Sequence, residues 1–423
     1  MGKSNLILPL LLLMAFAGLA QQPTVEISRD TTSTGKQRKE SPFQTGYYPI
    51  AFFDVDLRYF IKYNNYEGFR LGFGGITNER LFENFKIGGY VARGFKDQDW
   101  KYSLGGSVRL DPEHNTWINL YYINDIREIG AFNYLTDARV YSVFEPRLVN
   151  INQFFKYRTW QANIQHEFSS KVMSEFRIAR SKIDQIEDYR FNPGGNPFRN
   201  YKTTEATASI RISPKTNFFT TEDGRIEYFD GFPKISMQLT QAIKGVADSD
   251  FTYTKLGLKL DYYIKRTNLS STNILLEGAV AFGDAPLTHL FHAYPNSPTN
   301  ETILRRFSVA GRRSFETMYF GEFFSDKLAT LQVKHSLRRF YFSEKFQPEL
   351  VFITRHALGD LSNRDEHLGI GFNTLDQLYS ESGLELNKII FGFGLSFAYR
   401  YGFYHLPRFD DNISFKFTFY LKL

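Results

Sequence analysis

Apolar and polar positions alternate along most of this chain. Residues 51–63 read AFFDVDLRYFIKY, in which every odd position is apolar or aromatic and four even positions are charged. The same alternation occurs at 100–110, 255–264 and 391–401, and again in the last twelve residues, 412–423. Because successive side chains of an extended strand point to opposite faces, each segment predicts a β-strand with one apolar and one polar face.

The length and composition of these segments predict a membrane protein. They run about ten to thirteen residues, whereas soluble strands are usually nearer five or six and membrane-spanning strands about 9–11. Their apolar faces are crowded with Phe and Tyr, as expected of a lipid-facing band with aromatic girdles. In lipid, a closed barrel satisfies every backbone N–H and C=O group of a sheet. We therefore predict an all-β fold, a closed antiparallel transmembrane β-barrel, with a secreted soluble sandwich as the alternative.

The positions of the alternating segments predict sixteen strands. Fourteen is the fallback, because the connections 214–232 and 338–347 are long for periplasmic turns. The predicted strands lie near 50–63, 68–78, 84–94, 100–110, 117–127, 157–168, 172–182, 203–213, 233–243, 251–265, 271–283, 327–337, 348–358, 378–387, 390–401 and 412–423.

The connections between these strands predict an orientation. If the N-terminus lies in the periplasm, the connections that face outside are long and polar, and those that face the periplasm are mostly short, as in outer-membrane barrels. Both termini are then periplasmic. The long outer connections are 128–156, 183–202, 284–326, 359–377 and 402–411, and the short periplasmic ones include 169–171, 266–270 and 388–389.

The N-terminal residues predict an export signal. Residues 1–20 read MGKSNLILPLLLLMAFAGLA, a short apolar stretch after Lys3 that ends in a small-x-small cleavage site. This pattern is typical of a secretory signal peptide. We divide the chain into the signal peptide (1–20), a flexible periplasmic leader (21–46) and the barrel (47–423), a multi-pass protein of the outer membrane in a Gram-negative envelope.

Composition narrows the possible partners. The 423-residue chain has no cysteine, which excludes a disulfide scaffold, a zinc–cysteine site and a cysteine nucleophile. Its formal net charge of +6 comes without a compact Lys/Arg cluster, so we expect no nucleic-acid partner. The expected partners are the lipid bilayer of the outer membrane and envelope proteins, and the oligomeric state stays open.

Three motifs carry a family resemblance. They are Tyr63–Gly75 (YNNYEGFRLGFGG), Ser314–Met318 together with Glu322–Lys327 (SFETM and EFFSDK), and Glu381–Leu384 (ESGL). They resemble an uncharacterised family of bacterial outer-membrane barrels that are often found behind a carboxypeptidase-regulatory-like domain. The resemblance covers about residues 47–423.

A more distant similarity is to the BamA-like surface-antigen superfamily. It implies sixteen strands and a long loop after strand eleven that folds into the lumen, and the longest connection here, 284–326, follows the eleventh predicted strand. Residues 307–315 (FSVAGRRSF) are similar to the approach to that loop's Arg-Gly-aromatic tip, which makes a candidate lumen loop of Gly311, Arg312, Arg313, Ser314, Phe315 and Glu316.

Two departures from the superfamily pattern stand against a role in translocation or barrel insertion. Glu316 and Thr317 occupy the positions where Arg and Gly are expected. The 26 residues of the leader leave no room for periplasmic POTRA domains, and the regulatory-like domain is not expected either.

Charged residues on the polar strand faces are expected to point into the lumen, because charge facing mid-bilayer lipid is costly. The candidate lumen charges are Asp54, Asp56, Arg58, Lys259, Asp261 and Glu277. They predict either a polar conduit or a surface that receives the loop; the alternative is paired charge and water in a plugged interior. As a hypothesis, Arg312 or Arg313 pairs with one of Asp54, Asp56, Asp261 and Glu277.

The sequence contains no recognisable catalytic or metal-binding motif. His289 and His292 form an i, i+3 pair without a neighbouring carboxylate in sequence, so we predict no metal ligation. The sequence has no G-x-S-x-G elbow. We predict no catalytic residues, no cofactor and no metal, and a non-enzymatic role in outer-membrane assembly, secretion or envelope maintenance. A passive pore or transporter is the first alternative, and a barrel lipase or protease is the second.

Overall fold

The computed structural model describes residues 46–137, 146–215, 217–220, 226–229, 231–298, 308–343, 346–390 and 392–419. All of them belong to the second of two units, Ser41–Leu423. The predicted signal peptide and all but the last residue of the predicted leader lie outside the described residues. Within the described ranges, no helix has the length and apolar character needed to cross a bilayer.

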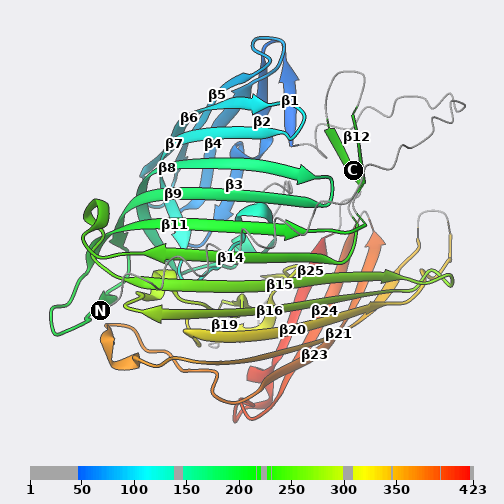
Figure 1. Cartoon of the computed structure of the whole chain (residues 1–423). Helices are drawn as coiled ribbons and strands as arrows, with labels where there is room; N and C mark the ends of the chain where they lie inside the picture. Colours follow the sequence, from blue (N-terminus) through cyan, green and yellow to red (C-terminus); the bar gives the residue numbers. More distant parts are fainter. Residues whose placement is uncertain are drawn as a thin grey trace, which may run out of the picture. The chain divides into compact units, whose positions relative to one another are not determined.

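The regular secondary structure of the described chain is almost entirely β (Figure 1). Its short 3-10 helices are η1 (Leu57–Tyr59), η2 (Leu135–Asp137), η3 (Pro146–Val149), η4 (Val246–Asp248), η5 (Leu287–His289), η7 (Arg364–Glu366) and η8 (Phe409–Asn412). The strands are β1 (Tyr47–Ile50), β2 (Phe53–Asp56), β3 (Ile61–Asn64), β4 (Gly68–Thr77), β5 (Phe85–Gly94), β6 (Trp100–Asp111), β7 (Thr116–Glu128), β8 (Phe154–Ser169), β9 (Val172–Gln185), β10 (Arg190–Phe191), β11 (Asn200–Ile212), β12 (Asn217–Thr220), β13 (Ile226–Phe229), β14 (Lys234–Ala242), β15 (Tyr253–Lys265), β16 (Ser271–Gly283), β17 (Pro295–Ser297), β18 (Ser308–Val309), β19 (Phe315–Tyr319), β20 (Lys327–Ser336), β21 (Glu349–Asp360), β22 (His367–Leu368), β23 (Tyr379–Ile390), β24 (Phe393–Gly402) and β25 (Ile413–Phe419).

One large sheet of nineteen strands dominates the fold. From β4 to β25, each long strand pairs antiparallel with the next long strand in the chain, and the short strands between them do not interrupt this ladder. Figure 1 shows β8, β9, β11, β14, β15 and β16 running side by side. At one end of the ladder, β4 pairs with both β2 and β3, and β1 pairs with β2. At the other end, β25 pairs in parallel with the two-residue β18. Among the described residues, no ladder joins β25 to β1, β2 or β3.

The first predicted strand, 50–63, is not continuous, and this corrects the sequence prediction. The chain forms β2, then the 3-10 turn η1, then β3. Asp56 caps the turn, because its carboxylate accepts hydrogen bonds from the backbone N–H of Arg58 at 3.0 Å and from the guanidinium of Arg58 at 2.8 Å. Such local side-chain bonds compete with the strand ladder, and alternation alone does not reveal them.

The connections 214–232 and 338–347, which are long for periplasmic turns, contain additional secondary structure. Residues 214–232 include the small antiparallel pair β12–β13. The connection between β20 and β21 continues their pairing, since Phe340 N–H donates to the carbonyl of Pro348 at 3.0 Å. Their length therefore comes from added hairpins.

The two-faced strands of the prediction are present, with the polar face buried. In β25, Lys416 is 1% exposed while Phe417 is 45% exposed. In β6, Lys101 is 2% exposed while Leu104 is 66% exposed. This is the reverse of a soluble domain, in which charged side chains are almost never fully buried and large apolar ones usually are.

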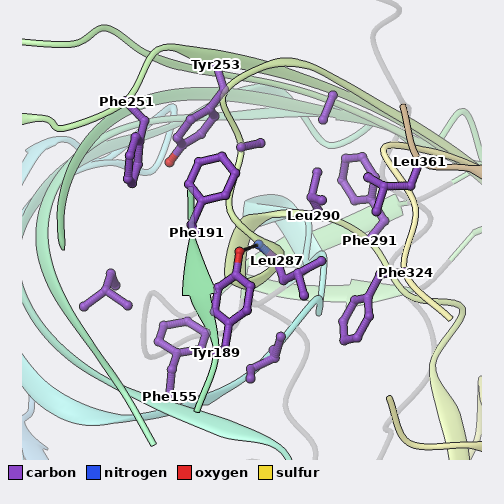
Figure 2. Close-up of a cluster of buried hydrophobic side chains, with 14 of the residues drawn as sticks. Phe155, Tyr189, Phe191, Phe251, Tyr253, Leu287, Leu290, Phe291, Phe324 and Leu361 are labelled. Atoms are coloured by element: carbon purple, nitrogen blue, oxygen red, sulfur yellow. Dashed lines mark hydrogen bonds between the residues drawn. The ribbon is translucent and has the colours of Figure 1, made fainter. Parts of the chain in front are cut away.

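Three connections and several strand ends meet in an apolar cluster, shown in Figure 2. The labelled side chains, Phe155, Tyr189, Phe191, Phe251, Tyr253, Leu287, Leu290, Phe291, Phe324 and Leu361, lie around one another, and all are 7% exposed or less. The Tyr189 hydroxyl accepts the N–H of Leu287 at 2.9 Å. β10 also pairs with β22, so the apolar residues of the described connections 185–200, 283–298, 308–327 and 360–379 pack together in one group, here called the loop cluster.

Candidate functional site

The connection 284–326 is here called the long loop, and its described residues, 284–298 and 308–326, contact the polar face of the sheet. Near its start, the Thr288 hydroxyl is 2.5 Å from the Tyr201 hydroxyl of β11. Farther along, β17 and β19 pair in parallel within the loop. Lys416 of β25 donates to the backbone carbonyl of Glu316 at 3.0 Å. Two distant parts of the sheet therefore hold the same loop.

Glu316 is the centre of the contact between loop and sheet. One carboxylate oxygen accepts the Ser314 hydroxyl at 2.7 Å and the Gly311 N–H at 3.1 Å. The other accepts the Asn296 amide at 2.7 Å and lies 2.9 Å from the Lys416 ammonium. The residue is 1% exposed, so these donors replace the water that a buried carboxylate loses.

A second buried carboxylate holds the backbone of the same segment. Glu381 of β23 accepts the N–H of Glu316 and the N–H of Thr317, both at 2.9 Å, and the Thr317 hydroxyl at 2.6 Å. Arg355 of β21 donates to Glu381 at 2.7 Å and lies 4.0 Å from Glu316. The four side chains of Glu316, Glu381, Arg355 and Lys416, here called the carboxylate lock, balance two negative charges with two positive ones.

The electrostatics of the lock keep Glu316 ionised. Burial on its own raises the pKa of this carboxyl group, but the positive charges of Lys416 and Arg355 and the hydrogen bonds of Lys416 and Ser314 outweigh burial and hold the pKa below its usual value. Charge-assisted hydrogen bonds to an ionised carboxylate are strong and directional, so Glu316 holds the loop in a defined position on the sheet.

Two further contacts fasten the loop on either side of the lock, an ion pair of Glu322 with Arg400 and a hydrogen-bond contact of His292 with the Glu128 carboxylate. Glu322 accepts two hydrogen bonds from Arg400 of β24, at 2.7 and 3.1 Å. Glu128 at the end of β7 binds Arg147 at 2.6 Å and the His292 ring nitrogen at 2.9 Å. The long loop is thus held to the sheet at three charged contacts.

The predicted lumen-loop residues divide into buried and exposed ones. Gly311, Ser314, Phe315 and Glu316 are buried, whereas Arg312 and Arg313 are exposed. Gly311 has no room for a side chain, because a Cβ atom would lie 2.0 Å from the Ser314 hydroxyl. Of these six residues, Glu316 pairs directly with charges of the sheet. The charge of Arg313 acts on Glu277 of β16, and the Arg313 carbonyl accepts from Gln332 at 2.8 Å. Pairing of Arg312 or Arg313 with a wall carboxylate stays a hypothesis.

The predicted wall charges form two separate groups. Asp54 accepts the Asn78 amide at 3.0 Å, and Asp56 binds Arg58. On the adjacent strands β15 and β16, Lys259 and Glu277 face each other in register, and Asp261 accepts the Asn273 amide at 2.7 Å. Lys259 forms an ion pair with Asp137, a residue of η2. The two groups lie on different parts of the sheet and do not join the carboxylate lock.

Arg355, Glu381 and Lys416 lie outside the predicted set of site residues. A signal for them exists, because each is a charged residue on the polar face of a predicted strand, and Glu381 opens one of the family motifs. Strand alternation shows which way such a residue points but does not show which loop residue it meets.

The histidine pair of the loop behaves as a structural element. His292 contacts Glu128, a carboxylate far away in sequence, and His289 is buried with its ring nitrogen 2.7 Å from the Thr288 hydroxyl. Among the residues that the structure describes, no group of three or more His, Cys, Asp or Glu side chains is arranged to hold a metal ion.

Comparison with known proteins gives a family and a fold. Residues 43–286 match the model of a family described as "Family of unknown function (DUF5686) C-terminal domain". The fold is similar to that in the crystal structure of BamA from Haemophilus ducreyi lacking POTRA domains 1–3, with a TM-score of 0.52 and 13% sequence identity over 84% of this chain and 68% of that chain. No curated protein matches the sequence. The predicted BamA-like all-β fold is confirmed, and the link with a carboxypeptidase-regulatory-like domain stays a prediction.

Proposed function

This chain belongs to the DUF5686 family, and we propose that it is an integral outer-membrane β-barrel that acts without catalysis in outer-membrane assembly, secretion or envelope maintenance. The barrel has sixteen long strands, counting β2 and β3 as one interrupted strand, and both termini are periplasmic. The observation that carries the proposal is the long loop, fastened to the polar face of the sheet by buried charges.

The distribution of side chains supports a membrane location. Large apolar side chains are exposed on many strands, including Phe73 on β4, Leu258 on β15 and Phe415 on β25. A soluble monomer rarely exposes apolar patches beyond a few hundred Å². In a bilayer this apolar surface contacts the lipid acyl chains, and the buried polar face lines the interior of the barrel.

A series of hydrogen bonds supports closure of the barrel. Asn65, in the turn after β3, binds the carbonyl of Asn150 at 3.2 Å, and the Asn150 amide binds the carbonyl of Val309 at 2.8 Å. Val309 is paired with Phe417 of β25. Segment 146–151 and β18 therefore bridge the first and last strands, which close into a cylinder with a seam.

The seam supports a role that involves other polypeptides. The edge of β25 is covered by the two residues of β18, and β2 at the other end of the sheet is covered by the four residues of β1, whereas the long strands from β5 to β24 have long antiparallel partners on both sides. An uncovered strand edge is a template for pairing with another chain. Because β18 has two residues, an incoming strand has few hydrogen bonds to break when it replaces β18 on β25. The role in assembly or secretion uses this edge.

Depletion of the protein tests the proposed role. We expect loss of the gene product to lower the amounts of other outer-membrane proteins, measured by quantitative proteomics of isolated outer membranes. An outer-membrane proteome equal to that of the parent strain overturns the assembly and secretion role. The barrel itself is tested separately, by comparing the gel mobility of unboiled and boiled protein.

Conductance separates this proposal from a passive pore. The long loop and the loop cluster occupy the polar side of the sheet, so purified protein in a planar bilayer is expected to show no steady current. A stable conductance in the unmodified protein would favour the pore instead. The Ser380 hydroxyl lies 2.9 Å from the His356 ring, but the other ring nitrogen of His356 contacts the Thr354 hydroxyl and not the carboxylate that a serine hydrolase triad uses. We therefore propose that the protein is not an enzyme.

A further inference from the structure

The hairpin that joins β20 and β21, residues 337–348, extends beyond its neighbours. β16 begins at Ser271, which faces Ser336, so the described residues 337–343 have no strand partner on that side. The hairpin still keeps its own pairing, with Phe342 N–H donating to the carbonyl of Phe346 at 3.3 Å. A two-stranded hairpin in water is marginally stable at best, which indicates that another surface covers this one.

The exposed side chains of this hairpin are aromatic and basic. Tyr341 is 71% exposed and Phe342 is 68% exposed, and the rings of Phe342 and Phe346 lie 5.3 Å apart. Arg338 and Arg339 are exposed as well, and neither forms an ion pair with a carboxylate of the described residues. Aromatic rings beside unpaired guanidinium groups suit the interface between lipid and water, where apolar bodies and charged tips are both satisfied.

The depth of the hairpin agrees with that interface. The chain from Lys327 to Ser343 extends about 55 Å at about 3.3 Å per residue, which is about 40 Å of depth at a tilt near 45°. A hydrocarbon core is about 30 Å thick and about 40–45 Å with its head groups. If Lys327 lies at one interface, the tip of the hairpin lies in the head-group layer of the opposite one.

We propose that hairpin 337–348 lies in the head-group layer of the inner leaflet and binds anionic phospholipid through Arg338 and Arg339. The inner leaflet follows from the end of the sheet at which the hairpin lies, which is shared with the tight β8–β9 and β23–β24 turns assigned to the periplasm. The inference rests on the proposed membrane barrel. The apolar surface continues onto the sheet next to the hairpin, where Phe352 of β21 is exposed.

The absence of native cysteine allows a direct test with the full chain. Ser343→Cys carries an environment-sensitive fluorophore at the hairpin, and Leu104→Cys carries it on the exposed face of β6. Each labelled protein is folded into vesicles of phosphatidylcholine, with or without about one-third phosphatidylglycerol. Quenching by lipids brominated near the head group or deep in the acyl chain reports the depth of the label.

We expect shallow quenching at position 343 that increases with phosphatidylglycerol, and deep quenching at position 104 in both lipids. Arg338→Gln with Arg339→Gln should lower the ratio of membrane-bound to aqueous hairpin about five-fold per arginine. The matched control, Lys265→Gln with Arg266→Gln, removes the same charge from the adjacent exposed turn and should leave the quenching at 343 unchanged.

Each contrary result is distinct. Deep quenching at 104 without quenching at 343 overturns the hairpin proposal and leaves the membrane barrel intact, as expected if the hairpin instead meets a protein. No quenching at 104 overturns the barrel itself. If quenching at position 343 occurs only after lipopolysaccharide is added to the vesicles, recognition of inner-leaflet phospholipid is overturned. The same conclusion follows if the control variant lowers the quenching as much as the double arginine variant does.

Discussion

At the scale of single residues, Glu316 connects more parts of the molecule than its neighbours in the loop. Its carboxylate contacts Asn296 and Ser314 within the loop and Lys416 in β25, and its backbone N–H binds Glu381 in β23. Burying charge is costly unless the geometry is well satisfied, and removing one partner leaves the other buried and alone. The lock should therefore be sensitive to single changes.

Glu316→Gln is expected to destabilise the folded protein by about 3–5 kcal/mol, because it leaves Lys416 buried without its counter-charge. Thermal unfolding in detergent, followed by gel mobility of unboiled samples, measures the change. Asp248→Asn removes one partner of an exposed pair with Arg180 and should cost no more than about 1 kcal/mol. Equal effects of the two substitutions would contradict the role given to the lock.

The double variant Glu316→Gln with Lys416→Met should be more stable than the sum of the two single changes predicts. Removing both charges together leaves no buried charge without a partner, and coupling between contacting residues is commonly about 0.5–3 kcal/mol. Additive losses in a double-mutant cycle would show that the two side chains do not interact as the distances indicate.

At the scale of elements, the loop cluster is held by buried histidines as well as by aromatic rings. His367 of β22 lies 2.9 Å from the Tyr189 hydroxyl and stacks on Phe191. Burial disfavours the charged imidazolium and lowers the pKa of His367 to about 4, and it lowers the pKa of His289 to about 3. Both rings are therefore neutral in the folded cluster at neutral pH.

The loop cluster should loosen in mild acid. The pKa of histidine in an unfolded chain is about 6.5, so between about pH 6.5 and 4 the unfolded cluster binds more protons, and its stability falls as pH falls. The loss should be on the order of 1–3 kcal/mol. Protease cleavage within 185–200 and 360–379 should accelerate at pH 5 relative to pH 7.5 in intact protein.

His367→Gln should reduce this pH dependence and leave the part that is due to His289, because the glutamine amide keeps hydrogen-bonding capacity but does not titrate. His114→Gln is the matched control, since His114 is partly exposed beside Asp111 at another site and should leave the dependence intact. A His367→Gln protein with the parental pH profile would show that other groups govern the opening of the cluster.

At the scale of the whole molecule, the ends of the sheet are joined through segments that are not part of the long-strand ladder. Ala310 N–H donates to the carbonyl of Phe417 at 2.8 Å, which places the loop on the edge of the last strand. The same loop is fixed by the carboxylate lock. The position of the loop and its contact with the edge of the last strand therefore depend on the same element.

The neighbour of β25 can be tested by crosslinking. Val309→Cys with Phe417→Cys should form a disulfide on mild oxidation, because the two positions are paired in register and bridged cysteines need Cα atoms about 4.4–6.8 Å apart. Val309→Cys with Phe415→Cys, shifted by two residues, should crosslink poorly. A crosslink from Phe417→Cys to Phe53→Cys instead would place β25 directly against β2 and contradict the bridged seam.

The strands and their faces could be predicted from the sequence, because alternation is a local property of an extended chain and the large sheet repeats it from strand to strand. Lys101, Lys259 and Lys416 are buried on the polar face as alternation predicts. The same pattern located the long loop, whereas the candidate segment from Gly311 to Glu316 came from the resemblance to the surface-antigen superfamily.

Only the tertiary structure decided which charges meet. Glu316 pairs with Lys416, a hundred residues later, and its backbone N–H with Glu381, sixty-five residues later, because the path of the loop across the sheet sets those contacts and local periodicity carries no trace of that path. The same holds for the break at η1, which depends on one aspartate's hydrogen bonds, and for β18 on the edge of β25, which depends on where the loop ends up after all the strands have paired.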